Sequence, residues 1–135
     1  MISVDTLINS PLEKVWQHWV SPESIIKWNH ASDDWHCPSA TNDFKIGGTF
    51  SYTMSAKDGS STFNFTGIYT KIEPQKLIET TLTDGRKVSV DFEKVDDQNT
   101  IVTENFETEE TNSIDQQRTG WQAILDNFKK YCEAN

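Results

Sequence analysis

The sequence has few cysteines and few basic residues, and each shortage excludes a class of protein. Cys37 and Cys132 are the only two cysteines, and they form no C-x-x-C pair, which favours reduced thiols in a cytoplasmic protein over a disulfide framework. Twelve lysines and arginines stand against 21 aspartates and glutamates, a formal net charge of -9. Nucleic-acid binding needs basic residues that replace counterions on phosphates, so we expect no nucleic-acid partner.

Long apolar runs are also missing. No stretch approaches the roughly 18 apolar residues of a membrane span, and the N-terminal segment lacks the basic and apolar pattern of a secretory signal. We therefore expect no membrane insertion. Aromatic residues, in contrast, are plentiful, with five Trp, seven Phe and three Tyr in 135 residues. This length predicts a single domain over residues 1–135, with large side chains around a core or a cavity.

Two short helices are predicted after a first strand over residues 2–9. The segment SPLE at residues 10–13 is typical of a helix start, with Ser as cap, Pro in the first turn and Glu completing a capping box. SPES at residues 21–24 repeats the signal, so the second helix ends near Trp28. Residues 29–43 have no regular period and are predicted to be a loop, long enough to suggest a function.

A meander of strands follows, and a long helix ends the chain. Phe50, Tyr52 and Met54 alternate with polar residues, which predicts a strand with one apolar face. Two Asp-Gly turns favour hairpins, and the parity of apolar residues changes near Gly67, which predicts a bulge there. Ser113 begins an amphipathic helix, whose apolar stripe consists of Trp121, Ile124, Leu125, Phe128, Tyr131 and Cys132. The fold class is therefore α+β, with a curved antiparallel sheet of six or seven strands around that helix.

Four segments carry a resemblance to a known family: INSPLEKVWQHWVSPESIIKW, DFKIGGTFSYTM, FTGIYTKIEPQKLIETT and GWQAILDNFKKY. They resemble the START-like, helix-grip (SRPBCC) superfamily, in the branch named after the activator of Hsp90 ATPase. The resemblance covers nearly the whole chain. It implies a ligand cavity under the last helix, since members of the superfamily bind lipids, sterols, polyketides or hormones there and a minority are enzymes. The chain lacks the additional N-terminal domain of the eukaryotic chaperone activators, so the resemblance supports chaperone stimulation less.

The segment KWNHASDDWHC, residues 27–37, gathers residues that could bind metal or line a pocket. Its two histidines and Cys37 are elements that bind zinc, but their spacing matches no regular zinc pattern, and neighbouring His and Cys side chains point apart instead of forming a catalytic pair. We expect no metal, no cofactor and no catalytic residue here. Trp28, His30 and Trp35 are predicted to line the mouth of the cavity.

Glu104 stands out on the last strand, because it shares a face with Val102 and Phe106 that is predicted to point at the helix. A carboxylate buried there must be paired, or else protonated with a raised pKa. It is either a ligand-orienting group or general base, or a structural residue that turns to solvent or pairs with Tyr52 or Arg86.

The sequence as a whole predicts a module that binds a small apolar or amphipathic molecule between the sheet and the last helix. Two alternatives stay open. A chaperone co-factor or protein-interaction domain predicts a collapsed cavity and an outer apolar or acidic patch, and a cyclase- or hydrolase-like enzyme predicts at least two polar groups that converge inside the cavity. The predicted ligand-binding residues are Trp28, His30, Trp35, Phe50, Tyr52, Met54, Phe65, Glu104, Trp121, Leu125 and Phe128.

Overall fold

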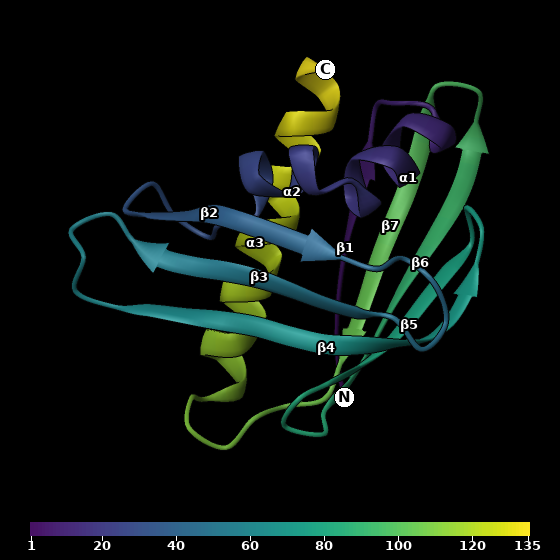
Figure 1. Ribbon diagram of the computed structural model, residues 1–135. Helices are drawn as coiled ribbons and strands as arrows, with labels where there is room; N and C mark the ends of the chain where they lie inside the picture. Colours follow the sequence, from purple (N-terminus) through teal and green to yellow (C-terminus); the bar gives the residue numbers. More distant parts are fainter.

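A curled antiparallel sheet of seven strands packs against one long helix in the computed structural model, which describes residues 1–135 (Figure 1). The hydrogen-bonded order is β1-β7-β6-β5-β4-β3-β2, so consecutive strands from β2 to β7 form a meander and β1 closes its far edge. The strands are β1 (Ile2–Ile8), β2 (Trp35–Asn42), β3 (Thr49–Ala56), β4 (Thr62–Glu73), β5 (Leu77–Leu82), β6 (Lys87–Asp96) and β7 (Asn99–Phe106). The α+β helix-grip architecture expected from the sequence is confirmed.

Three helices complete the fold. Two short ones, α1 (Leu12–Val20) and α2 (Pro22–Trp28), follow β1, and the long helix α3 (Ile114–Ala134) ends the chain. Figure 1 shows α1 and α2 gathered near the C-terminal half of α3. The predicted capping box of α3 is confirmed, because Ser113 Oγ accepts from the Gln116 amide at 3.1 Å and Gln116 Oε1 accepts from the Ser113 amide at 3.0 Å. No helix is long and apolar enough to cross a bilayer.

The core is one cluster of 20 buried residues, formed where the apolar face of the sheet meets the helices. Strand alternation works as predicted in the middle of the sheet: Val102, Glu104 and Phe106 of β7 are all buried. On the neighbouring strand Val90 pairs with Glu104, and on the other side Val4 does. This register places a carboxyl group in the centre of an otherwise apolar face.

One sequence prediction is wrong in part, because residues 29–43 are not a continuous loop. They contain β2, an edge strand that pairs with β3. The register shifts between His36 and Ser39, around Pro38, which has no amide hydrogen to donate to a ladder. An edge strand with this irregularity is exposed on parts of both faces, so its sequence lacks the alternation that marks a strand.

Two local predictions also need correction. Neither Ser10 nor Ser21 makes a side-chain capping bond, and the residue that caps α1 is Pro11. Ser10 is instead buried, with its carbonyl accepting a hydrogen bond from Thr100 Oγ1 at 2.9 Å. The bulge expected near Gly67 is also displaced, since the register between β4 and β5 shifts after Tyr69.

Gly67 has a different role, which is to make room for the Phe50 ring. A Cβ atom at this position would lie 2.7 Å from Phe50 Cζ and 2.8 Å from the Thr81 carbonyl oxygen. The carbonyl belongs to a paired strand and cannot move away cheaply. We expect Gly67→Ala to lower the free energy of unfolding by about 1–3 kcal/mol, the usual cost of overpacking, as measured by urea denaturation.

The control for this variant is Gly120→Ala on α3, where a Cβ atom would have nothing within 4 Å. Alanine is the better helix former, so this control is expected to gain up to about 1 kcal/mol. Equal stability of the Gly67→Ala variant and the native protein would contradict the close packing described here.

Candidate functional site

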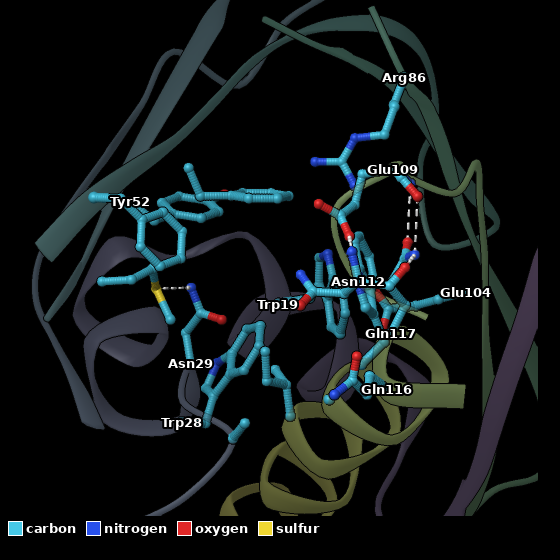
Figure 2. A pocket seen from close by; sticks show the side chains of 17 residues that line it. Trp19, Trp28, Asn29, Tyr52, Arg86, Glu104, Glu109, Asn112, Gln116 and Gln117 are labelled. Carbon is cyan, nitrogen blue, oxygen red and sulfur yellow. Dashed lines mark hydrogen bonds between the residues drawn. The ribbon is translucent and has the colours of Figure 1, made fainter. Parts of the chain in front are cut away.

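A cavity of about 570 Å³ lies between α3, the end of α2 and the inner face of the sheet. This volume is within the range of small-molecule sites. Aromatic side chains make up much of its wall, and the polar side chains gather mainly towards the segment before α3 and the start of α3 (Figure 2). The apolar lining consists of Trp19, Trp28, Ala31, Tyr52, Met54, Phe63, Phe65, Gly120, Trp121 and Ile124, and the polar lining of Asn29, Arg86, Glu104, Glu109, Asn112, Gln116 and Gln117.

Packing from behind holds the tryptophans of the wall in place. Trp19 and Trp28 stack at a centroid distance of 5.0 Å, and Phe128 meets both rings edge-on from α3, at 4.9 Å and 4.7 Å. The Trp28 indole also donates to the His18 carbonyl at 3.0 Å. Such fixed rings lose little side-chain entropy when a molecule binds against them.

On the opposite wall, Trp121 of α3 is positioned by the sheet. It stacks on Phe106 with centroids 4.0 Å apart and an interplanar angle of 10°, and its edge meets Phe65 at 6.1 Å. The cavity therefore has flat aromatic surfaces contributed by both α3 and the helices that follow β1.

A first polar region is formed by Tyr52 and Asn29. The hydroxyls of Tyr52 and Tyr69 lie 3.5 Å apart, and burial, followed by the charge of Tyr69, raises the pKa of Tyr52 well above its usual range. Asn29 Nδ2 contacts Met54 Sδ at 3.5 Å, a weak acceptor. Figure 2 shows these two residues on the side of the cavity away from Glu104.

Glu104 is the second polar group, and it has no partner in the protein. It is 5% exposed, it lines the cavity, and burial alone raises its pKa to about 8. The residues that pair with Glu104 on the adjacent strands are Val4 and Val90, and neither has a side chain that can donate a hydrogen bond. The two structural readings considered from the sequence are therefore wrong, since Glu104 neither turns to solvent nor pairs with Tyr52 or Arg86. At neutral pH its carboxyl group is mainly protonated and can donate as well as accept a hydrogen bond.

The segment between β7 and α3 forms part of the rim and is fastened by Gln117. The Gln117 side chain accepts from the Glu109 amide at 2.9 Å and donates to the carbonyls of Glu109 at 3.0 Å and Asn112 at 2.9 Å. Arg86 lies on the turn between β5 and β6, where its Nε donates to Asp84 Oδ2 at 2.9 Å. Figure 2 shows Arg86 and Glu109 together at one edge of the cavity.

Six of the residues predicted to bind ligand line the cavity and five do not. Those in the lining are Trp28, Tyr52, Met54, Phe65, Glu104 and Trp121. The five elsewhere are His30, Trp35, Phe50, Leu125 and Phe128. Leu125 and Phe128 are fully buried and Phe50 nearly so, because core side chains cover them on all sides.

His30 and Trp35 lie beside the cavity for reasons that the loop sequence does not reveal. His30 Nε2 faces Asn127 Nδ2 of α3 at 3.1 Å, and burial is the main cause that lowers its pKa. Trp35 packs on Phe63 at the sheet edge, with ring centroids 6.0 Å apart. Glu104 therefore faces the cavity and His30 does not. The enzyme alternative cannot use these two residues as its converging pair of polar groups.

Sequence reasoning missed several lining residues, above all Trp19, Asn29, Arg86 and Gln117. Trp19 had a signal, because it lies on the same apolar helical face as Val15. Asn29 and Arg86 had none, because they lie in the segments between regular elements. Gln117 lies one turn before Trp121 on the same face of α3, so its position gave a signal that its polar side chain concealed.

A curled sheet that grips one long helix over a cavity defines the helix-grip, START-like class of protein. Within this class, residues 9–133 match the family model described as "Activator of Hsp90 ATPase homolog 1-like protein". The chain belongs to this family. No curated protein matches it at a significant level.

Solved structures agree with this assignment. The AHSA1-like protein from Aeromonas hydrophila is 41% identical, with a TM-score of 0.88 over 98% of this chain and 93% of that one. Chr148 from Cytophaga hutchinsonii is 48% identical, with a TM-score of 0.84 over 99% of this chain and 92% of that one. The di-domain ARO/CYC protein StfQ of the steffimycin biosynthetic pathway has a TM-score of 0.77 at 12% identity, over 98% of this chain and 45% of that one. At that identity the likeness concerns the fold alone.

Proposed function

We propose that this protein binds a small, largely apolar molecule in the cavity between the sheet and α3. The observation that carries the proposal is the cavity itself, about 570 Å³ in volume, with the unpartnered carboxyl group of Glu104 inside it. The protein gives this carboxyl group no hydrogen-bond partner, so a ligand in the cavity that hydrogen-bonds to it supplies the pairing that the protein lacks.

Binding in such a site depends mainly on burial. Each Å² of apolar ligand surface removed from water contributes roughly 25 cal/mol, and the aromatic walls formed by Trp19, Trp28 and Trp121 supply the matching surface. Tyr52 and Glu104, at separate places in the wall, then fix the orientation of the ligand. Membership in the family and the fold support a module of this kind.

The alternatives have less support from the site. A protein-interaction domain predicted a collapsed cavity, whereas this cavity is as large as those that hold small molecules. The ARO/CYC activity in the name of StfQ belongs to a protein that shares only the fold. We infer that residues 1–135 act as one cytoplasmic binding domain whose partner is a small molecule.

Filling the cavity from α3 tests this proposal. Gly120 lines the cavity and a Cβ atom there meets open space, so Gly120→Phe places a ring in the volume that the ligand needs. With 9-anthracenemethanol as probe and energy transfer from tryptophan as the signal, we expect affinity to fall at least about tenfold, the loss of roughly 1.4 kcal/mol of binding free energy.

The matched control is Ile114→Phe, which adds a ring to an exposed position of the same helix. This control is expected to bind the probe as the native protein does, and both variants should keep the native unfolding temperature within a few degrees. Unchanged affinity in a folded Gly120→Phe variant, or no binding of the probe by the native protein, would contradict the proposed function.

A further inference from the structure

We propose, in a refinement that rests on the binding function above, that the cavity selects a lipophilic organic cation, an ammonium group on an apolar body, which pairs with Glu104. Three observations meet at this site. The Glu104 carboxyl group is more than nine-tenths buried, faces the cavity and has no partner in the protein. Flat tryptophan surfaces surround the same space, and the whole chain carries a formal charge of -9.

A cation answers the chemistry of this site better than a neutral or anionic ligand does. A carboxylate inside a protein needs an opposite charge or several donors to remain ionised, and the protein supplies neither. An ammonium group supplies both. Its charge is also attracted to the faces of Trp and Tyr rings, with Trp the strongest partner. An anion would instead have to be buried beside a carboxyl group.

The remaining charged groups do not provide this pairing. Arg86 and Glu109 line one edge of the cavity, from the β5–β6 turn and the segment before α3, and their charges are opposite. Val4 of β1 and Val90 of β6 flank Glu104 in the sheet. The lining contributed by α3 is uncharged, namely Gln116, Gln117, Gly120, Trp121 and Ile124. Glu104 is thus the acid on the inner face of the sheet, whereas the other acid of the lining, Glu109, lies at the edge beside Arg86.

Pairing with a cation has a proton balance that can be measured. Burial raises the pKa of Glu104 to about 8, so at pH 7 most of the molecules carry the proton. A bound ammonium group stabilises the carboxylate, and the carboxyl proton passes to the buffer while the ligand keeps its own protons. Binding of a cation therefore releases a proton from most sites at pH 7, and binding of a neutral ligand releases none.

The test compares three probes on one ring system: the ammonium form of 9-(aminomethyl)anthracene, neutral 9-anthracenemethanol and anionic anthracene-9-carboxylate. Calorimetry in two buffers of different ionisation enthalpy gives both affinity and proton release. For the native protein we expect the ammonium probe to bind at least about tenfold more tightly than the alcohol, as a charge pair in a cavity of low dielectric requires, with proton release for the ammonium probe alone.

The variant Glu104→Gln keeps the shape and removes the group that can ionise, so we expect it to lose both the preference and the proton release while it still binds the alcohol. Glu93→Gln, the same substitution at an exposed position of β6, should keep both. Equal binding of ammonium and alcohol without proton release would overturn the cation inference and leave the binding function standing. Tightest binding of the carboxylate would overturn it in favour of Arg86. Binding of none of the three would contradict the proposed function itself.

Discussion

The native protein is expected to become less stable as the pH rises from about 4.5 to about 8, and the variant Glu104→Gln is expected to lack this decline. The folded protein holds the Glu104 proton up to a pKa of about 8, whereas the ordinary pKa of a glutamate, as in the unfolded chain, is 4.5. Between these values the unfolded chain binds fewer protons, so the free energy of unfolding falls with pH. The slope is about 1.4 kcal/mol per pH unit in the middle of this window and smaller near its two ends, so the loss of unfolding free energy over the window is about 4 kcal/mol.

The measurement is urea denaturation of both proteins at pH 5, 6.5 and 8. The free energy of unfolding of Glu104→Gln minus that of the native protein should grow steadily with pH. His18 and His30 act in the opposite direction, because burial lowers the pKa of each and their contribution to stability is regained as the pH rises. Both proteins contain these histidines, so their effect cancels in the difference.

The exposed variant Glu93→Gln serves as control and should show the same pH dependence as the native protein. A constant difference between Glu104→Gln and the native protein across the three pH values would mean that Glu104 is ionised or well solvated in the folded state. That result would contradict the burial on which the site rests.

Phe128→Ala is expected to lower the free energy of unfolding by about 3–5 kcal/mol, the usual range for a buried phenylalanine. The Phe128 ring is completely buried and meets Trp19 at 4.9 Å and Trp28 at 4.7 Å. Its removal opens a void behind the aromatic wall, so the two tryptophans lose the support that keeps them flat against the cavity. Affinity for 9-anthracenemethanol should therefore fall as well.

Urea denaturation checks the stability change, and Ile114→Ala is the matched control. Ile114 lies on the same helix but is 56% exposed, so its truncation should stay within about 0.5 kcal/mol. A loss below about 1 kcal/mol in Phe128→Ala would show that α3 is not held against α1 and α2 as described.

The sequence predicted the centre of the sheet well, for a physical reason. Strand β7 is paired on both sides and buried on one face, so period-two alternation alone placed Glu104 inward among apolar residues. The long helix was equally legible, from its capping box at Ser113 to its apolar stripe. Where a strand or helix is regular and buried on one face, the spacing of its apolar residues shows which face is buried.

The cavity wall was less predictable, because an apolar stripe does not reveal which of its parts faces an empty space. Along α3, Trp121 and Ile124 line the cavity, while Leu125 and Phe128 pack into the core. The difference comes from α1 and α2, which cover the C-terminal half of the helix. His30 and Trp35 were misplaced for a related reason, since they lie in the irregular segment after α2 and at the start of an edge strand, where no periodic signal marks the direction of a side chain.

The most direct test of the account uses two-dimensional ¹⁵N–¹H NMR to monitor how the indole signals of the five tryptophans respond to a bound probe. Trp19, Trp28 and Trp121 line the cavity, whereas Trp16 and Trp35 lie outside it. On titration with 9-anthracenemethanol we expect the signals of the first three to shift together and saturate, while the other two stay nearly unchanged. Saturating shifts confined to Trp16 or Trp35, or no shift of any indole, would contradict a ligand site between the sheet and α3.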